Sequence, residues 1–314
     1  MAVPDLTLTG VIPPVLTPLT DDGEVDVASL ERLVQHLLDG GVSGLFALGS
    51  SGETVFLTDP QRDQALEVIV RSAAGAVPVI AGCIEPTTPR VIQRVRAAER
   101  FGVDAIVATA PFYAIVGPHE TERHLRAVGA ASDLPLLAYD IPVCVGRKLP
   151  NDLLLQLASD GVLAGVKDSS GDDVAFRQLV VGLQDRQVED FATLTGHEVV
   201  VDAMLLAGAT GSVPGLANVD PHGYARLHRG AADGDWDTAH KEQERLVRLF
   251  RIVDAADPAT AAGATRGIGA FKTALHLLGV IDSPAVSLPM RRYDAAETGR
   301  VREHLERAGL SVRR

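Results

Sequence analysis

The chain has 314 residues, of which 46% are hydrophobic and 22% charged, and its formal net charge at pH 7 is −12. An acidic excess argues against nucleic-acid binding, which needs clustered Lys and Arg. The sequence contains no uninterrupted apolar run of about 18 residues, so no membrane span is predicted. The first ten residues do not resemble a signal peptide, and Cys83 and Cys144 lack disulfide-like spacing. We therefore expect a cytoplasmic protein with neither nucleic acid nor a membrane as partner.

Short apolar runs alternate with longer amphipathic stretches along the first two thirds of the chain. Each run is four to six residues long, is rich in Val, Ile, Leu or Ala, and shows little in/out alternation. Strands buried on both faces of a parallel sheet have this pattern. The eight predicted strands are Gly10–Val15, Gly44–Leu48, Val77–Ala81, Asp104–Ala108, Leu134–Tyr139, Val162–Val166, Phe191–Leu194 and roughly Thr210–Val213.

Helical periodicity separates these runs. After Asp26, a suitable N-cap, five aliphatic residues between 30 and 38 fall on one helix face, and Gly40 follows as a helix end. Pro60 and Pro89 introduce the next helices, and further prolines precede the predicted helices 119–131 and 150–159. Repeated βα units make a parallel sheet, and eight of them predict an α/β fold of the (β/α)8 barrel type.

The strand pattern stops at about Asp220. Segments 221–232, 235–253, 267–279 and 294–309 are all predicted to be helical, with a loop at 254–263. We therefore expect residues 1–219 to form the barrel core. Residues 220–314 should supply the last barrel helix and a C-terminal helical extension, with the whole chain forming a single domain.

Lys167 is the most informative candidate for catalysis. Active sites of such barrels lie at the C-terminal ends of the strands, and Lys167 is the only one of four lysines that ends an apolar run. Burial there disfavours the ammonium and leaves a neutral amine that can attack a ketone. A structural lysine paired with Asp168 or a neighbouring carboxylate explains this position alone equally well. Lys272, in contrast, is predicted to lie on a helix with its ammonium reaching solvent.

Other strand ends carry hydroxyl and phenol groups. The loop that begins at Gly49 offers backbone N–H groups and the hydroxyls of Ser50 and Ser51, which together can hold a carboxylate. Tyr113 and Tyr139 can transfer protons if their oxygens reach a substrate, although packing explains each tyrosine taken singly. No metal site is predicted, because the nine histidines neither cluster with cysteines nor show a zinc-binding spacing.

Taken together, several segments resemble the dihydrodipicolinate synthase/N-acetylneuraminate lyase superfamily over essentially the whole chain. They are Gly49–Glu53, Pro111–Tyr113, Tyr139–Pro142, Gly165–Asp168, Gly211–Pro221 and Phe271–Leu275. The resemblance implies that Lys167 forms an imine with pyruvate or a longer 2-keto acid, without any other cofactor. Tyr139 would be the acid/base, Ser50 would link it to Tyr113 of a neighbouring subunit, and Ser51 would bind the keto-acid carboxylate. A homotetramer is therefore expected.

The resemblance also indicates where the second substrate binds. The residues expected to contact the substrate are Gly49, Ser51, Cys144, Ser169, Gly196, Glu198 and Val213. Dihydrodipicolinate synthases usually carry an arginine at the position of Cys144, and a thiol cannot form the ion pair of a guanidinium. Sialic acid lyases place two adjacent acids where this chain has Glu198 and Val199.

These departures favour a 2-keto-3-deoxy-sugar-acid aldolase. Dihydrodipicolinate synthase, which condenses pyruvate with aspartate semialdehyde, and a dehydratase of keto-deoxy sugar acids remain alternatives. A protein of another class, which binds a keto acid and regulates without catalysis, is a further alternative.

Overall fold

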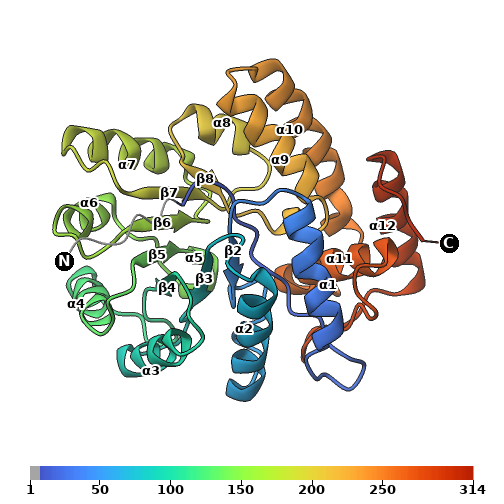
Figure 1. Cartoon of the computed structure of the whole chain (residues 1–314), viewed down its shortest axis with the longest axis horizontal. Helices are drawn as coiled ribbons and strands as arrows, with labels where there is room; N and C mark the ends of the chain where they lie inside the picture. The colour runs from blue at the N-terminus through green and yellow to red at the C-terminus, as the bar shows by residue number, and fades with distance from the viewer. Residues whose placement is uncertain (1–7, 314) are drawn as a thin grey trace.

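Eight parallel strands lie at the centre of the computed structural model, which describes residues 8–313, and helices surround them (Figure 1). The strands are β1 (Gly10–Val11), β2 (Leu45–Ala47), β3 (Val79–Gly82), β4 (Ala105–Thr109), β5 (Leu136–Asp140), β6 (Gly165–Asp168), β7 (Ala192–Thr195) and β8 (Gly211–Ser212). Their order is β1-β8-β7-β6-β5-β4-β3-β2, with every neighbouring pair parallel.

Backbone hydrogen bonds between the first and second strand regions close the ring. Ser43 N donates to Val11 O at 2.8 Å, Phe46 N donates to Pro13 O at 3.0 Å, and Val15 N donates to Phe46 O at 2.9 Å. The prediction of a (β/α)8 barrel is therefore confirmed. The first strand is shorter than predicted, because the prolines at 13 and 14 have no N–H to continue a ladder.

Helices follow most strands and form the outer layer. In the barrel they are α1 (Val27–Asp39), α2 (Asp59–Ala73), α3 (Thr88–Glu99), α4 (Pro118–Gly129), α5 (Pro142–Val145), α6 (Asn151–Ser159), α7 (Asp173–Asp185), α8 (Val201–Leu206), the 3-10 turn η1 (Gly215–Asn218) and α9 (Pro221–Ala232). Asp26 caps α1 by accepting a hydrogen bond from Ser29 N at 3.0 Å, and Gly40 ends it, as the sequence predicts.

The C-terminal helices gather on one side of the barrel, where they are orange to red in Figure 1. They are α10 (Trp236–Phe250), η2 (Arg251–Asp254), α11 (Gly263–Leu278) and α12 (Ala295–Arg307). Phe271 and Leu275 of α11 and Leu305 of α12 belong to the same apolar cluster as the strands. The division into residues 1–219 and 220–314 stays a prediction.

Asn218 fixes the loops that follow β1 and β8 to each other. Its side chain is completely buried; Oδ1 accepts from Leu16 N at 3.1 Å, and Nδ2 donates to Pro14 O at 2.9 Å. Hydrogen bonds across such long sequence separation hold the C-terminal rim of the barrel in one arrangement. None of the helices in residues 8–313 combines the length and apolar character needed to cross a bilayer.

Candidate active site

Lys167 and Tyr139 are in direct contact at the C-terminal ends of two adjacent strands. The register of β5 and β6 places Tyr139 opposite Lys167, so both side chains leave the same face. Lys167 is only 4% exposed, and its Nζ donates a hydrogen bond to Tyr139 Oη at 3.1 Å. The Nζ also lies 4.2 Å from the ring centroid of Tyr139 and 4.8 Å from that of Phe46. A buried amine and a phenol are thus within reach of the same reacting atom.

Asp168 is not the partner of Lys167. Its carboxylate instead contacts Lys148 Nζ at 3.3 Å and accepts a hydrogen bond from Ser170 N at 2.7 Å. Within residues 8–313, Lys167 forms no ion pair with any carboxylate. The interpretation of Lys167 as half of a structural ion pair with Asp168 is therefore wrong.

The Gly49–Ser51 loop lies beside this pair. Ser50 Oγ is 3.5 Å from Tyr139 Oη, so the structure brings Ser50, Tyr139 and Lys167 into one chain of polar contacts. Glycine is required at position 49, because a Cβ there would lie 2.7 Å from the Phe46 ring. Ser51 is half-buried in the same loop.

Lys272 anchors the loop that begins at Gly49 through an ion pair with Glu53, which the sequence did not predict. Its side chain is completely buried in α11, forms an ion pair with buried Glu53 and donates to Ala285 O at 2.8 Å. The expectation that its ammonium reaches solvent is wrong, because a carboxylate from a distant loop meets it inside the protein. Burial lowers the pKa of Lys272, and Glu53 opposes that shift. Glu53 also accepts a hydrogen bond from Ser287 N at 2.7 Å.

Tyr113 lies outside this cluster in a single chain. Its side chain is 100% exposed, and its backbone has a left-handed φ of 70°, which is uncommon for a residue other than glycine. The side chain therefore contacts neither Lys167 nor Tyr139 of its own subunit. That a neighbouring subunit brings its copy of Tyr113 to the site stays a prediction.

Cys144 lies on α5, close enough to Lys167 for the charge of the amine to affect its thiol. The residue is exposed at the surface, but loss of solvent around its thiol raises the thiol's pKa, while the charge of Lys167 and the hydroxyl of Ser50 oppose this shift. The position at which many synthases have a guanidinium is thus occupied by a neutral group next to Lys167.

The remaining predicted contacts line the ends of β6, β7 and β8. Gly196 N donates to Asp168 O at 2.7 Å, and a Cβ at Gly196 would displace the hydroxyl of Ser169. Val213 is buried and its N–H donates to Thr195 O at 2.7 Å. These contacts place Ser169, Gly196 and Val213 side by side at the strand ends.

Glu198 and Gly196 border a pocket of about 400 Å³ beneath the C-terminal helices. Its other walls come from His197 and Val199 and from the α10–α11 region, including Phe250, Arg266 and Phe271. Glu198 Oε1 accepts hydrogen bonds from Gly215 N and Leu216 N, whereas its buried Oε2 has no hydrogen-bond partner within residues 8–313. One carboxyl oxygen is therefore held by the backbone of η1, and the other is enclosed by the protein.

The ionisation of Glu198 is expected to make stability depend on pH. Burial raises the pKa of Glu198 from its ordinary value of 4.5 to about 7, against the opposing effects of Gly215, Leu216 and Lys167. Because the pKa is higher in the folded protein than in the unfolded chain, the stabilisation by the protonated form is present below about pH 4.5 and is lost as the pH rises through about 7. As Glu198 ionises, the free energy of unfolding should fall by an amount on the order of 3 kcal/mol. Glu198→Gln should remove this pH-dependent fall.

Urea unfolding of the wild type and of Glu198→Gln at several values between roughly pH 5 and 8, the titration range of Glu198, gives the difference between their free energies of unfolding. The variant should gain stability relative to the wild type as the pH rises. Glu306→Gln is a matched control, because Glu306 is exposed and forms no ion pair within residues 8–313. A constant difference between Glu198→Gln and wild type across this range would contradict the prediction.

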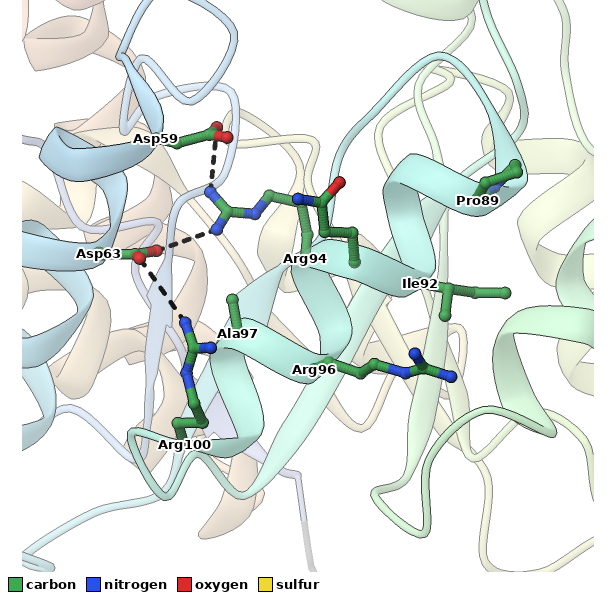
Figure 2. Close-up of a pocket in the computed structure, with 9 residues that line it drawn as sticks. Asp59, Asp63, Pro89, Ile92, Arg94, Arg96, Ala97 and Arg100 are labelled. Atoms are coloured by element: carbon green, nitrogen blue, oxygen red, sulfur yellow. Dashed lines mark hydrogen bonds and ion pairs between the residues drawn. The ribbon is translucent and has the colours of Figure 1, made fainter.

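A second pocket lies between α2 and α3 on the outside of the ring (Figure 2). It has a volume of about 450 Å³, and Arg94 crosses it to contact Asp59 at 3.1 Å and Asp63 at 3.0 Å. None of the site residues predicted from the sequence lines this pocket. The strand-end cluster around Lys167 is therefore the candidate active site.

Comparison with known proteins agrees with this fold. A model of the dihydrodipicolinate synthetase family matches residues 7–308. The 4-hydroxy-tetrahydrodipicolinate synthase of Laribacter hongkongensis is 31% identical over 304 residues, which cover 96% of this chain and 99% of that protein. An uncharacterized DapA-like lyase of Halobacterium salinarum is 32% identical over 307 residues, covering 97% of this chain and 95% of its own.

Solved structures give the same result. The E. coli K12 prophage protein YagE, solved in complex with pyruvate, has a TM-score of 0.90 at 26% identity and covers 98% of this chain and 100% of its own. The dihydrodipicolinate synthase of Bacteroides thetaiotaomicron has a TM-score of 0.87 at 30% identity, with the same coverage. The chain therefore belongs to the dihydrodipicolinate synthetase family, and it is a lyase.

Proposed function

We propose that Lys167 forms an imine with pyruvate and that the resulting enamine attacks an aldehyde. The observation that carries this proposal is the buried Lys167 Nζ, held 3.1 Å from Tyr139 Oη at the barrel mouth. The pyruvate complex of the similar protein YagE supports the choice of keto acid.

The chemistry requires only groups of the protein. The neutral amine of Lys167 adds to the ketone and water leaves, which gives a protonated imine that acts as an electron sink. Loss of a proton from the adjacent methyl group gives an enamine, whose carbon attacks the aldehyde. Tyr139 is suitably placed to move protons in these steps, with Ser50 as its hydrogen-bond partner. Ser51 and the N–H groups of the Gly49 loop would bind the keto-acid carboxylate.

Aspartate semialdehyde is the aldehyde that the relatives favour. Curated relatives at about 30% identity over most of the chain are named 4-hydroxy-tetrahydrodipicolinate synthase. We therefore place this activity ahead of the 2-keto-3-deoxy-sugar-acid aldolase favoured by sequence alone. The aldolase remains the second candidate because of one specific observation: Cys144 puts a neutral thiol beside Lys167 where an arginine would grip a second carboxylate.

Two parallel assays distinguish these activities. One follows condensation of pyruvate with aspartate semialdehyde, and the other follows pyruvate release from 2-keto-3-deoxygluconate. The proposal expects the larger kcat/KM with the semialdehyde. A larger kcat/KM with the sugar acid would favour the aldolase. Turnover of neither, in a folded protein, would contradict both candidate activities.

We further propose that the active form is an oligomer, with a tetramer expected, in which Tyr113 enters the site of a neighbouring subunit. Exposed apolar side chains support such a contact: Val55, Ile115 and Val143 are 53%, 60% and 88% exposed. Segments 113–115 and 143–146 adjoin each other, because a Cβ at Gly146 would lie 3.1 Å from Ile115. A second copy of the chain would cover this surface and bring its tyrosine with it.

Mixing two inactive variants tests whether Tyr113 acts between subunits. Lys167→Ala and Tyr113→Phe are each expected to lose most activity as pure proteins. Mixed oligomers should recover a substantial part of it, because the Tyr113→Phe subunit keeps its lysine and receives an intact tyrosine from its neighbour. Activity is measured after unfolding and refolding the two proteins together. No recovery above the sum of the separate proteins would contradict a contribution from the neighbouring subunit.

A further inference from the structure

α7 and α8 present large apolar side chains on the outside of the barrel, where α7 lies at the edge of the molecule (Figure 1). Val174 and Val181 of α7 are 70% and 42% exposed, and Leu206 of α8 is 65% exposed. Arg177 Nη1 donates to Leu206 O at 3.4 Å, so the two helices share one surface. Exposed apolar side chains that gather on one surface indicate a contact with another protein surface.

This surface is different from the one proposed for Tyr113. The Tyr113 surface is built from the segments that follow β2, β4 and β5, whereas α7 and α8 follow β6 and β7. A tetramer made of two dimers needs two different self-complementary surfaces on each subunit. The Tyr113 surface would supply the first of them, and the expected tetramer requires a second.

The outward face of α7 carries charges that are complementary to themselves about Val181. Arg177 lies about one helical turn before Val181, and Asp185 lies about one turn after it. Gln178 and Gln184 are likewise placed at equal separations on its two sides. All five residues are exposed, and their spacing puts them on one helix face. Within residues 8–313, Arg177 and Asp185 form no ion pair, and the two glutamine side chains form no hydrogen bond.

We propose that α7 pairs with α7 of a second copy of this chain, antiparallel, about a two-fold axis through Val181. The axis places Arg177 of each subunit against Asp185 of the partner subunit, so the ion pair forms twice. It also places Gln178 against the partner's Gln184, and a carboxamide can both donate and accept a hydrogen bond. A parallel pairing would set Arg177 against the partner's Arg177, so the charges select the antiparallel arrangement. The contact does not depend on the proposed imine chemistry.

Charge reversals on α7 test the pairing, with the dissociation constant of the full-length oligomer measured by analytical ultracentrifugation. Arg177→Asp and Asp185→Arg each turn both ion pairs into repulsive pairs. Each should therefore raise the dissociation constant by about tenfold or more, and tetramers should dissociate to dimers. The double variant Arg177→Asp/Asp185→Arg keeps opposite charges in exchanged positions, so its dissociation constant should return towards the wild-type value.

A mixture of Arg177→Asp and Asp185→Arg in equal amounts gives a second readout. The first variant has only negative charges at these two positions and the second has only positive charges, so unlike subunits attract and like subunits repel. The mixture should therefore form tetramers that neither variant forms alone at the same total concentration. Lys241→Asp is the matched control, because Lys241 on α10 is exposed and forms no ion pair within residues 8–313. It should leave the dissociation constant unchanged.

Dissociation constants that match wild type in both single variants, with the proteins folded by circular dichroism, would overturn the inference. So would a double variant and a mixture that stay as dissociated as the single variants, since the two charges would then not face each other. A monomeric wild-type protein would overturn this contact and the one through Tyr113 together. Failure of the Tyr113 mixing experiment alone, with the expected response of the α7 variants, would overturn only the proposed role of Tyr113 between subunits.

Discussion

Replacing Lys167 with alanine is expected to lower kcat/KM for the pyruvate-dependent reaction by about 10⁴-fold or more. Covalent catalysis is lost completely without the amine, because no other lysine of residues 8–313 forms a hydrogen bond with Tyr139 or Ser50. The fold should survive, since Lys167 forms no ion pair within residues 8–313 whose partner would be left unpaired. Steady-state kinetics and a thermal melt of the purified variant check both expectations.

Lys167→Arg separates a nucleophile from a structural cation. Arginine keeps a positive charge at this position, but its guanidinium stays protonated and cannot form the imine. The variant should therefore be as inactive as Lys167→Ala, whereas exposed Lys241→Ala should keep wild-type activity. Substantial activity in Lys167→Arg would show that the charge, rather than the amine's reactivity, is what the site requires.

Replacing Lys272 with methionine is expected to destabilise the fold by about 3–5 kcal/mol. Lys272 and Glu53 are both completely buried, so removing the ammonium leaves an uncompensated carboxylate in the interior. Ala285 O would also lose its hydrogen-bond donor. Urea unfolding should show a lower midpoint, and KM for pyruvate should rise, since Glu53 belongs to the loop that carries Ser50 and Ser51.

The double variant Lys272→Met/Glu53→Gln shows whether the effect comes from the pair. It should be more stable than Lys272→Met, because removing the orphaned charge recovers part of the loss. Lys241→Met, on the exposed surface, is the matched control and should change stability by less than about 0.5 kcal/mol. Equal stability of Lys272→Met and Lys241→Met would contradict the account of the buried pair.

Local physical chemistry explains why much of the barrel can be predicted from the sequence. A strand buried on both faces has to be apolar throughout, so runs such as Asp104–Ala108 lie within one residue of β4. Helix caps are also local: Asp26 and Gly40 mark the ends of α1 through hydrogen bonds to residues nearby in the chain. The same applies to α9, where Asp220 accepts from Gly223 N at 2.9 Å.

Features that depend on distant partners are not predictable in this way. The position of Lys272 in an amphipathic helix gives no sign that Glu53 meets it inside the protein. Lys148 likewise has no local sign of its contacts with Asp140 and Asp168. The short helix α5 is only four residues long and shows no helical periodicity, and neither α7 nor α8 was among the predicted helices.

The candidate site was predicted in part. Lys167 was found because it ends an apolar strand, and Tyr139 and Ser50 were assigned beside it by resemblance to the family; the structure brings all three together. The environment of Glu198 was not foreseen, since the backbone N–H groups that bind one of its oxygens come from η1, which follows a different strand. The predicted role of Tyr113 is to enter the site of a neighbouring subunit. The structure of a single chain does not test this role, because it concerns a surface between two subunits.

Reductive trapping of pyruvate tests the central claim most directly. The wild-type protein is incubated with carbon-13-labelled pyruvate and borohydride, digested, and its lysine-containing peptides are mapped by mass spectrometry. The imine mechanism predicts one labelled adduct, on the peptide that contains Lys167, and none in Lys167→Arg. Failure to label Lys167, or labelling of Lys148, Lys241 or Lys272 in its place, would contradict the assignment of Lys167 as the residue that forms the imine.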